Sequence, residues 1–334
     1  MRRQAGIEPH NDSVMTVRVS CPASLSGDVT RLLAANPSAS TLAVHAGASI
    51  SPPGDIIEAD LPREAVNDVI DALAALGVPE QGTIQILPVS TWVSQRALDS
   101  EERAAGSRSD AVVWADVVER AYEGTALTWT FLAFMTMATL LAAIAIVTDS
   151  VVLVIGAMVL GPEFVAIAAL GVGLVRRRWH LLGRALVTLL VGFASAIALV
   201  TVFALLARAL DLVQYSQLLT ENRPGTSFIY TANWWSFAIA LIAGAAGVLA
   251  LTSSRSESLV GVFISVTTIP AAGNIAIALA YGMWPEMWGS SLTLLVNVGG
   301  MAVAGWATLA VQQRAGRRIR GWRARRGPQR PAPR

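Results

Sequence analysis

The chain has 334 residues, of which 54% are hydrophobic and 14% are charged; its formal net charge is +2 and its mean hydropathy is +0.53. This composition departs from that of an average soluble protein in the direction of a membrane protein. The single cysteine, Cys21, excludes an internal disulfide and a zinc cluster built from cysteines. Most acidic residues lie before position 125. The small net charge is therefore the sum of three different parts, which are a head with charges of both signs, an apolar body and a basic tail.

Residues 1–98 alternate between strand-like and helix-like patterns. Period-two alternation predicts four strands, and apolar residues at helical spacing predict two helices. In chain order these are a strand at 15–20, a helix at 26–35, strands at 41–45 and 55–60, a helix at 62–76 and a strand at 83–87. This βαββαβ order predicts a ferredoxin-like α+β domain. Such a domain either binds a small regulator, here at the loop 20–27, or serves assembly without a ligand.

Residues 99–124 form the predicted connection to the membrane domain. A polar linker is followed by an amphipathic helix at 110–123, for which Ser109 can serve as the N-cap. This helix either lies along the membrane surface or packs against the head.

Six apolar stretches, each long enough to cross a bilayer, make up a predicted membrane domain at 125–313. They are 125–147, 151–175, 181–209, 233–252, 259–281 and 288–312. Arginines gather between spans two and three, between spans four and five, and after span six. By the positive-inside rule, we expect both termini to be cytoplasmic. The expected location is a bacterial inner membrane. The basic tail, 314–334, is predicted to be disordered and to attract anionic lipids, with no nucleic-acid partner.

Spans two and five carry a matching motif. Residues 149–168 read DSVVLVIGAMVLGPEFVAIA and residues 257–276 read ESLVGVFISVTTIPAAGNIA, which aligns Pro162 with Pro270. Proline removes a helical hydrogen bond, and breaks at matching places in two halves indicate a transporter built from repeats. Each half, 125–209 and 233–312, holds three spans. Because an odd number of spans carries the chain to the other side of the membrane, the second half must run in the opposite orientation. We therefore expect an inverted 3+3 repeat with broken helices two and five.

An acidic residue stands next to the first of these prolines, deep within span two. Such an acid marks a functional site by default, so we expect Glu163 to bind a cation or a coupling proton. Alternatively, a tilted or re-entrant span leaves it in a wet vestibule without a role. The predicted solute or ion pathway comprises Gly161, Pro162, Glu163, Thr267, Thr268, Pro270 and Asn274. In it, the two threonines and the asparagine supply oxygens from the opposite repeat.

Four residues before these spans are predicted helix caps. Carboxylates there complement the helix dipole, and serines accept backbone N–H groups. They are Asp149, Ser150, Glu257 and Ser258. Asn297 in span six is expected to hydrogen-bond between helices.

The chain resembles a prokaryotic membrane family catalogued as domain of unknown function 389. The resemblance lies in residues 55–87, 148–164 and 265–282, and its most specific part is the run Ile155-Gly-Ala-Met158 followed by Pro162. It implies a soluble head joined to membrane spans and supplies no substrate. Family members usually have an apolar residue where Glu163 stands, so a coupling role for Glu163 would not be general to the family.

Motifs of the common hydrolases and of nucleotide binding are missing, and the three histidines lie far apart. We therefore expect no enzyme activity, no cofactor and no metal centre. Secondary transport of a small solute or ion, with a head that regulates or assembles a homo-oligomer, fits the repeat and the buried acid. The alternatives are a sensor whose head binds a metabolite and a channel that uses the same cavity.

Overall fold

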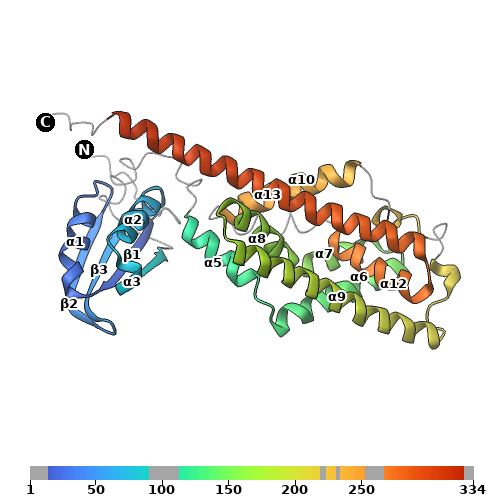
Figure 1. Ribbon diagram of the computed structural model, residues 1–334. Coiled ribbons are helices and arrows are strands. Elements are labelled where there is room, and N and C mark those ends of the chain that lie inside the picture. Colours follow the sequence, from blue (N-terminus) through green and yellow to red (C-terminus); the bar gives the residue numbers. More distant parts are fainter. Residues whose placement is uncertain (1–13, 90–112, 219–222, 231–233, 253–266, 327–334) are drawn as a thin grey trace, which may run out of the picture. The chain divides into compact units, whose positions relative to one another are not determined.

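The computed structural model describes residues 14–89, 113–218, 223–230, 234–252 and 267–326 (Figure 1). The chain divides into two compact units, which we call the head, up to Val117, and the helical unit, Val118–Leu251 and Arg255–Arg334; Thr252 is grouped with the head. The predicted caps Glu257 and Ser258, the predicted cap Ser109 and the first part of span five lie outside the described residues.

The head contains a four-stranded sheet in which all neighbouring strands are antiparallel, in the order β2-β3-β1-β4. Its strands are β1 Val14–Cys21, β2 Thr41–Ile50, β3 Pro53–Pro62 and β4 Thr83–Pro88. Its helices are α1 Ala23–Ala34, α2 Arg63–Ala75 and the short α3 Val78–Gln81. The predicted strands and helices are therefore present in the predicted order. The predicted ligand-binding loop 20–27 is absent, because only Pro22 separates β1 from α1.

Alternation along β1 explains why the helices cover one face of this sheet. Val17, Val19 and Cys21 are fully buried, whereas the residues between them are half-buried on the opposite face. The buried side chains pack against apolar residues of both helices, which are Val29, Leu33, Val66, Val69 and Leu73. On the open face, Arg18 pairs with Glu58 across the strands at 2.6 Å. Burial raises the pKa of the Cys21 thiol, so this cysteine is not a thiolate at neutral pH.

Gly54 lies where β3 passes closest to the end of β1. A Cβ at this position would overlap the carbonyl oxygen of Cys21 and lie 2.9 Å from Cα of Pro22. We expect Gly54→Ala to lower the free energy of unfolding of the head by about 1–3 kcal/mol, the usual cost of overpacking. Gly27→Ala, in the exposed middle of α1 with nothing within 4 Å, should instead stabilise it by about 0.5–1 kcal/mol. Urea unfolding of the full-length variants would compare the two, and equal effects would contradict this packing.

The helix that follows the linker, α5 Trp114–Gly124, begins on the head. Val113 belongs to the head core, and the backbone N–H of Trp114 donates to Oδ1 of Asn67 in α2 at 3.1 Å. Of the two predicted placements for this helix, the structure thus supports packing against the head for its first turn.

Four helices of the helical unit are long and apolar enough to cross a membrane, and a fifth crossing is possible for one bent pair. The four are α6 Trp129–Val147, α9 Trp179–Ala209, α10 Trp234–Thr252 and the first 32 residues of α13 Trp284–Arg326. The bent pair is α7 Val151–Leu160 and α8 Glu163–Val175, which meet at 54°. Only the 14 residues of α12, Thr268–Tyr281, represent predicted span five. The count of six spans stays a prediction.

Two features differ from the sequence-based expectation. Pro270 does not break α12, because it is the third residue of that helix, where an N–H would have no partner within the helix. The basic tail is not disordered from residue 314, because α13 continues to Arg326. Arginine and alanine favour helix, and the helix ends just before Gly327 and Pro328.

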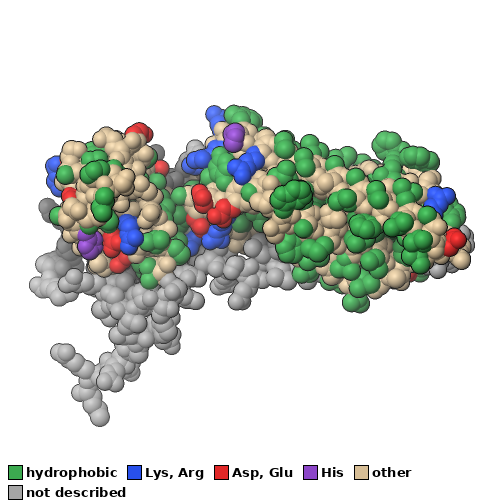
Figure 2. All heavy atoms as spheres, turned by 90° about the horizontal axis from the view of Figure 1, so that it is seen from below, with side chains coloured by type: hydrophobic (Ala, Val, Ile, Leu, Met, Phe, Trp, Pro, Cys, Tyr) green, Lys and Arg blue, Asp and Glu red, His purple; other side chains and the backbone are tan. Residues whose placement is uncertain are grey.

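The surface and the packing of this unit are those of a multi-pass membrane protein. On the face shown in Figure 2, hydrophobic side chains cover the middle of the helical unit, and charged side chains gather toward its ends. Leu190, Val202 and Leu295 are 62–70% exposed. Glycines allow close contact between helices, as lipid-embedded helices require. A Cβ on Gly171 of α8 would lie 2.9 Å from the backbone nitrogen of Trp306 in α13.

Candidate functional site

The break between α7 and α8 places an acidic side chain inside the helical unit. Pro162 cannot donate a backbone hydrogen bond, and the chain turns at Gly161 and Pro162 before α8 begins at Glu163. Glu163 is only 6% exposed. A Cβ on Gly161 would overlap Oε2 of Glu163 and lie 2.7 Å from Ile269 of α12, so glycine is needed for the carboxyl group to fit.

The carboxyl group of Glu163 reaches the start of the corresponding helix in the other half. The hydroxyl group of Thr268, the first residue of α12, donates to Oε1 of Glu163 at 2.6 Å. The second carboxyl oxygen, Oε2, is buried and has no hydrogen-bond partner among the described residues. Two helix starts that are more than 100 residues apart in sequence therefore meet at one carboxyl group, and one of its oxygens has no protein donor among the described residues.

Beside this contact, α13 is tied to the same helix start. The side-chain amide of Asn297 donates to Oγ1 of Thr267 at 2.8 Å, and Asn297 is 3% exposed. This bears out the interhelical hydrogen bond expected of Asn297. The predicted pathway residues Gly161, Pro162, Glu163 and Thr268 thus lie together, with Thr267 adjacent in the chain.

Asn274 belongs to a second polar cluster instead of the Glu163 site. Its amide nitrogen donates to Oγ of Ser290 at 2.9 Å and to Oε2 of Glu286 at 3.3 Å. Both carboxyl oxygens of Glu286 also accept from one guanidinium nitrogen of Arg223, at 2.9 and 3.0 Å. Arg223 is 1% exposed. We call these four residues the Arg223 cluster; sequence reasoning missed it, although Arg223 is the one basic residue in the predicted loop between spans three and four.

The predicted caps before span two behave differently from each other. Ser150 is the N-cap of α7, where its hydroxyl group accepts from the backbone N–H of Leu153 at 3.4 Å. Asp149 instead has a left-handed backbone, with φ of +46°. Its carboxylate accepts from the backbone N–H of Gly225 at 3.1 Å and from the hydroxyl group of Thr226 at 2.9 Å. It therefore anchors the segment 223–230, which also supplies Arg223.

We expect Asp149→Ala to destabilise the helical unit by about 1–3 kcal/mol, because Thr226 is buried and both donors lose their acceptor. Asp149→Asn should cost less, since its amide oxygen still accepts one bond and asparagine tolerates the left-handed conformation. Thermal unfolding of the full-length variants in detergent would rank them, and an equal melting temperature for Asp149→Ala and the wild type would contradict the anchoring role.

Among the described residues, no group of three or more His, Cys, Asp or Glu side chains could hold a metal ion. The chemistry available at Glu163 is therefore that of one carboxyl group and neighbouring hydroxyl groups. Hard monovalent cations and protons suit such oxygen donors.

Residues 158–303 match the sequence profile of the family described as domain of unknown function (DUF389). This part of the chain is similar to the DUF389 family. The DUF389 match begins within α7 and ends within α13, so it contains Glu163, Thr268 and the Arg223 cluster. No curated protein and no solved structure matches the chain. The DUF389 match confirms the family resemblance inferred from the sequence and leaves the head outside its bounds.

Proposed function

We propose that this protein is a secondary transporter that moves a small cation, or a solute together with a proton, past the carboxyl group of Glu163. The observation that carries the proposal is the hydrogen bond between Glu163 and Thr268, which joins the starts of two short helices in the interior of the helical unit. Interrupted helices whose ends meet inside the bilayer are the usual binding sites of secondary transporters. A buried carboxyl oxygen without a protein donor among the described residues is suited to a proton or a metal cation.

The proposed architecture is an inverted 3+3 repeat of six spans. Its support is the similar setting of α8 and α12, each of which has a repeat proline at or near its start. Each of the two also packs against both α9 and α13. Phe164 of α8 contacts Gly247 of α10, and Gly273 of α12 lies against Ala142 of α6. Each short helix thus meets the first helix of the opposite half, as a twofold relation requires.

For the head we propose a ferredoxin-like fold that regulates transport or assembles copies of the chain. The support is the antiparallel strand order β2-β3-β1-β4, with a helix after β1 and another after β3. For the orientation we propose that both termini face the cytoplasm of a bacterial inner membrane. The support is the arginine run Arg176-Arg177-Arg178 and the basic end of α13, both on the same side of the predicted spans.

A thermal-shift screen of the full-length protein against protons and alkali cations tests this proposal. A ligand at 100-fold excess over its Kd stabilises the folded protein by about 2.7 kcal/mol. We expect one cation to raise the melting temperature of the wild type and of Asp211→Asn, an exposed acid-to-amide control, and to have no effect on Glu163→Gln. Stabilisation that persists in Glu163→Gln would reject the site and favour a ligand elsewhere, as in a sensor.

A further inference from the structure

The helical unit contains a cavity of about 640 Å³ that is separate from the Glu163 site. It lies between the end of α8, with the turn that follows, and the later part of α13. Its basic lining residues are Arg176, Arg177 and Arg314, and its apolar lining includes Leu174, Trp306 and Ala310. The volume is within the usual range for small-molecule sites, about 300–1,000 Å³.

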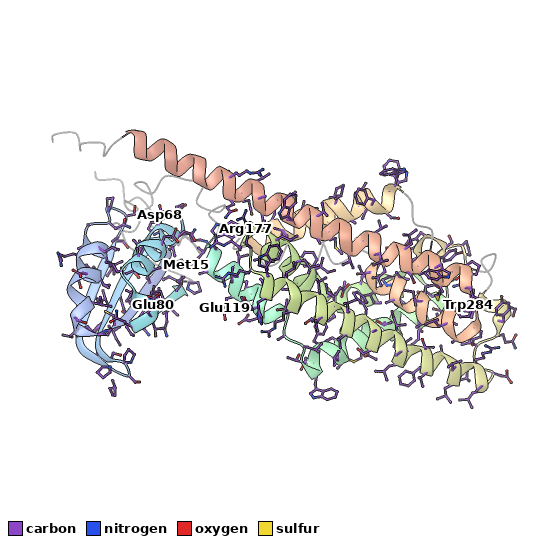
Figure 3. All side chains as sticks on the ribbon, viewed as in Figure 1. Met15, Asp68, Glu80, Glu119, Arg177 and Trp284 are labelled. Carbon is purple, nitrogen blue, oxygen red and sulfur yellow. The ribbon has the colours of Figure 1, made fainter. Side chains whose placement is uncertain are left out.

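Helix packing explains where this cavity opens. Helices α8 and α13 touch where Gly171 meets the backbone of Gly305 and Trp306. One turn further along the two helices, Leu174 and Val175 of α8 and Ala310 of α13 line the cavity. Leu174 and Trp306, which are 38% and 44% exposed, form the apolar side of the opening. Arg176 and Arg177 follow the end of α8, and Arg314 lies about two turns beyond Trp306 in α13. Figure 3 shows Arg177 at this end of the unit and Trp284 at the opposite end.

The backbone at Arg177 has an unusual conformation for this residue type. Its φ is +54°, and the turn is closed by hydrogen bonds from Arg177 to the carbonyl group of Leu174 and from Arg178 to that of Gly173. A helix end of this kind normally carries glycine, because a side chain in the left-handed region costs about 1–2 kcal/mol. An arginine at such a position points to a use for its guanidinium group.

We propose that this cavity binds the phosphate group of an anionic phospholipid. Guanidinium groups bind phosphate through two parallel hydrogen bonds, and no carboxylate lines the cavity among the described residues. In both helices the arginines come after the apolar lining residues in the direction of the predicted cytoplasmic side. This order matches a lipid with its headgroup at the interface and its acyl chains below. Of the predicted basic tail the site uses only Arg314, its first residue, and it does not depend on transport.

Binding of phosphatidylglycerol to the full-length protein, followed by native mass spectrometry, tests the proposal. We expect Arg177→Gly and Arg314→Gln each to raise the Kd about tenfold or more, the effect of losing one charge-assisted contact of about 1.4 kcal/mol. Arg177→Gly should leave the melting temperature unchanged or higher, because glycine suits the turn. The matched control is Arg178→Gln, which removes the same charge from the adjacent residue outside the cavity lining and should bind like the wild type.

Two results would overturn this assignment. Equal weakening by Arg178→Gln would mean that the lipid responds only to total charge. Binding of inorganic phosphate that depends on Arg177 and Arg314, without binding of phosphatidylglycerol, would make a soluble anion the ligand.

Discussion

Arg223→Met is expected to lower the free energy of unfolding of the helical unit by about 3–5 kcal/mol, the cost of breaking a buried ion pair from one side. Arg223 is 1% exposed, and the side chain of Glu286 is 12% exposed. The guanidinium group also donates to the carbonyl oxygen of Leu218. Without it, the carboxylate of Glu286 keeps only the long hydrogen bond from Asn274, at 3.3 Å, among its described contacts.

A second variant separates loss of the pair from loss of packing. Arg223→Met combined with Glu286→Gln leaves no unpaired charge, so it should be more stable than Arg223→Met alone. Arg178→Met, at an exposed arginine of the same unit, should change stability by less than about 0.5 kcal/mol. Equilibrium unfolding in mixed micelles would measure all three variants. An Arg223→Met protein within about 1 kcal/mol of the wild type would show that the pair contributes little.

The positions of the membrane helices could be predicted from the sequence because lipid imposes a length and a composition on them. Helix α6, Trp129–Val147, overlaps the predicted span 125–147. Helix α9, Trp179–Ala209, overlaps the predicted span 181–209. The break at Gly161 and Pro162 was also predictable, because it follows from the covalent chemistry of proline. The motif shared by 149–168 and 257–276 further suggested that Glu163 and Thr268 would meet.

The Arg223 cluster could not be predicted, because nothing local to Arg223 specifies its partner. The contact with Glu286 depends on how the segment 223–230 folds onto α12 and α13, and Asp149 from a different loop anchors that segment. The repeat motif predicts that Asn274 supplies an oxygen to Glu163 together with Thr268, and this is wrong. Asn274 is six residues further along α12, and its hydrogen bonds are to α13.

Glu163→Gln is expected to reduce ion flux through reconstituted protein by about tenfold to more than a hundredfold. Glutamine keeps the shape of the side chain and an oxygen that can accept from Thr268, so the contact between α8 and α12 is preserved. It loses the carboxylate, whose hydrogen bond or contact to a charged ligand is worth about 1.5–3 kcal/mol. Thr268→Val removes the hydroxyl donor to Glu163 and keeps the carboxyl group, so its effect on flux should be smaller.

The measurement that tests the central claim most directly is cation and proton flux into liposomes that contain the full-length protein, under an imposed membrane potential. Wild type, Glu163→Gln and the exposed control Asp211→Asn are compared at equal protein density, with dyes for internal pH and sodium. The proposal predicts flux above empty liposomes for the wild type and for Asp211→Asn, and flux at least about tenfold lower than the wild type for Glu163→Gln. Flux that is equal in the wild type and Glu163→Gln at every pH would contradict a role for this carboxyl group in transport.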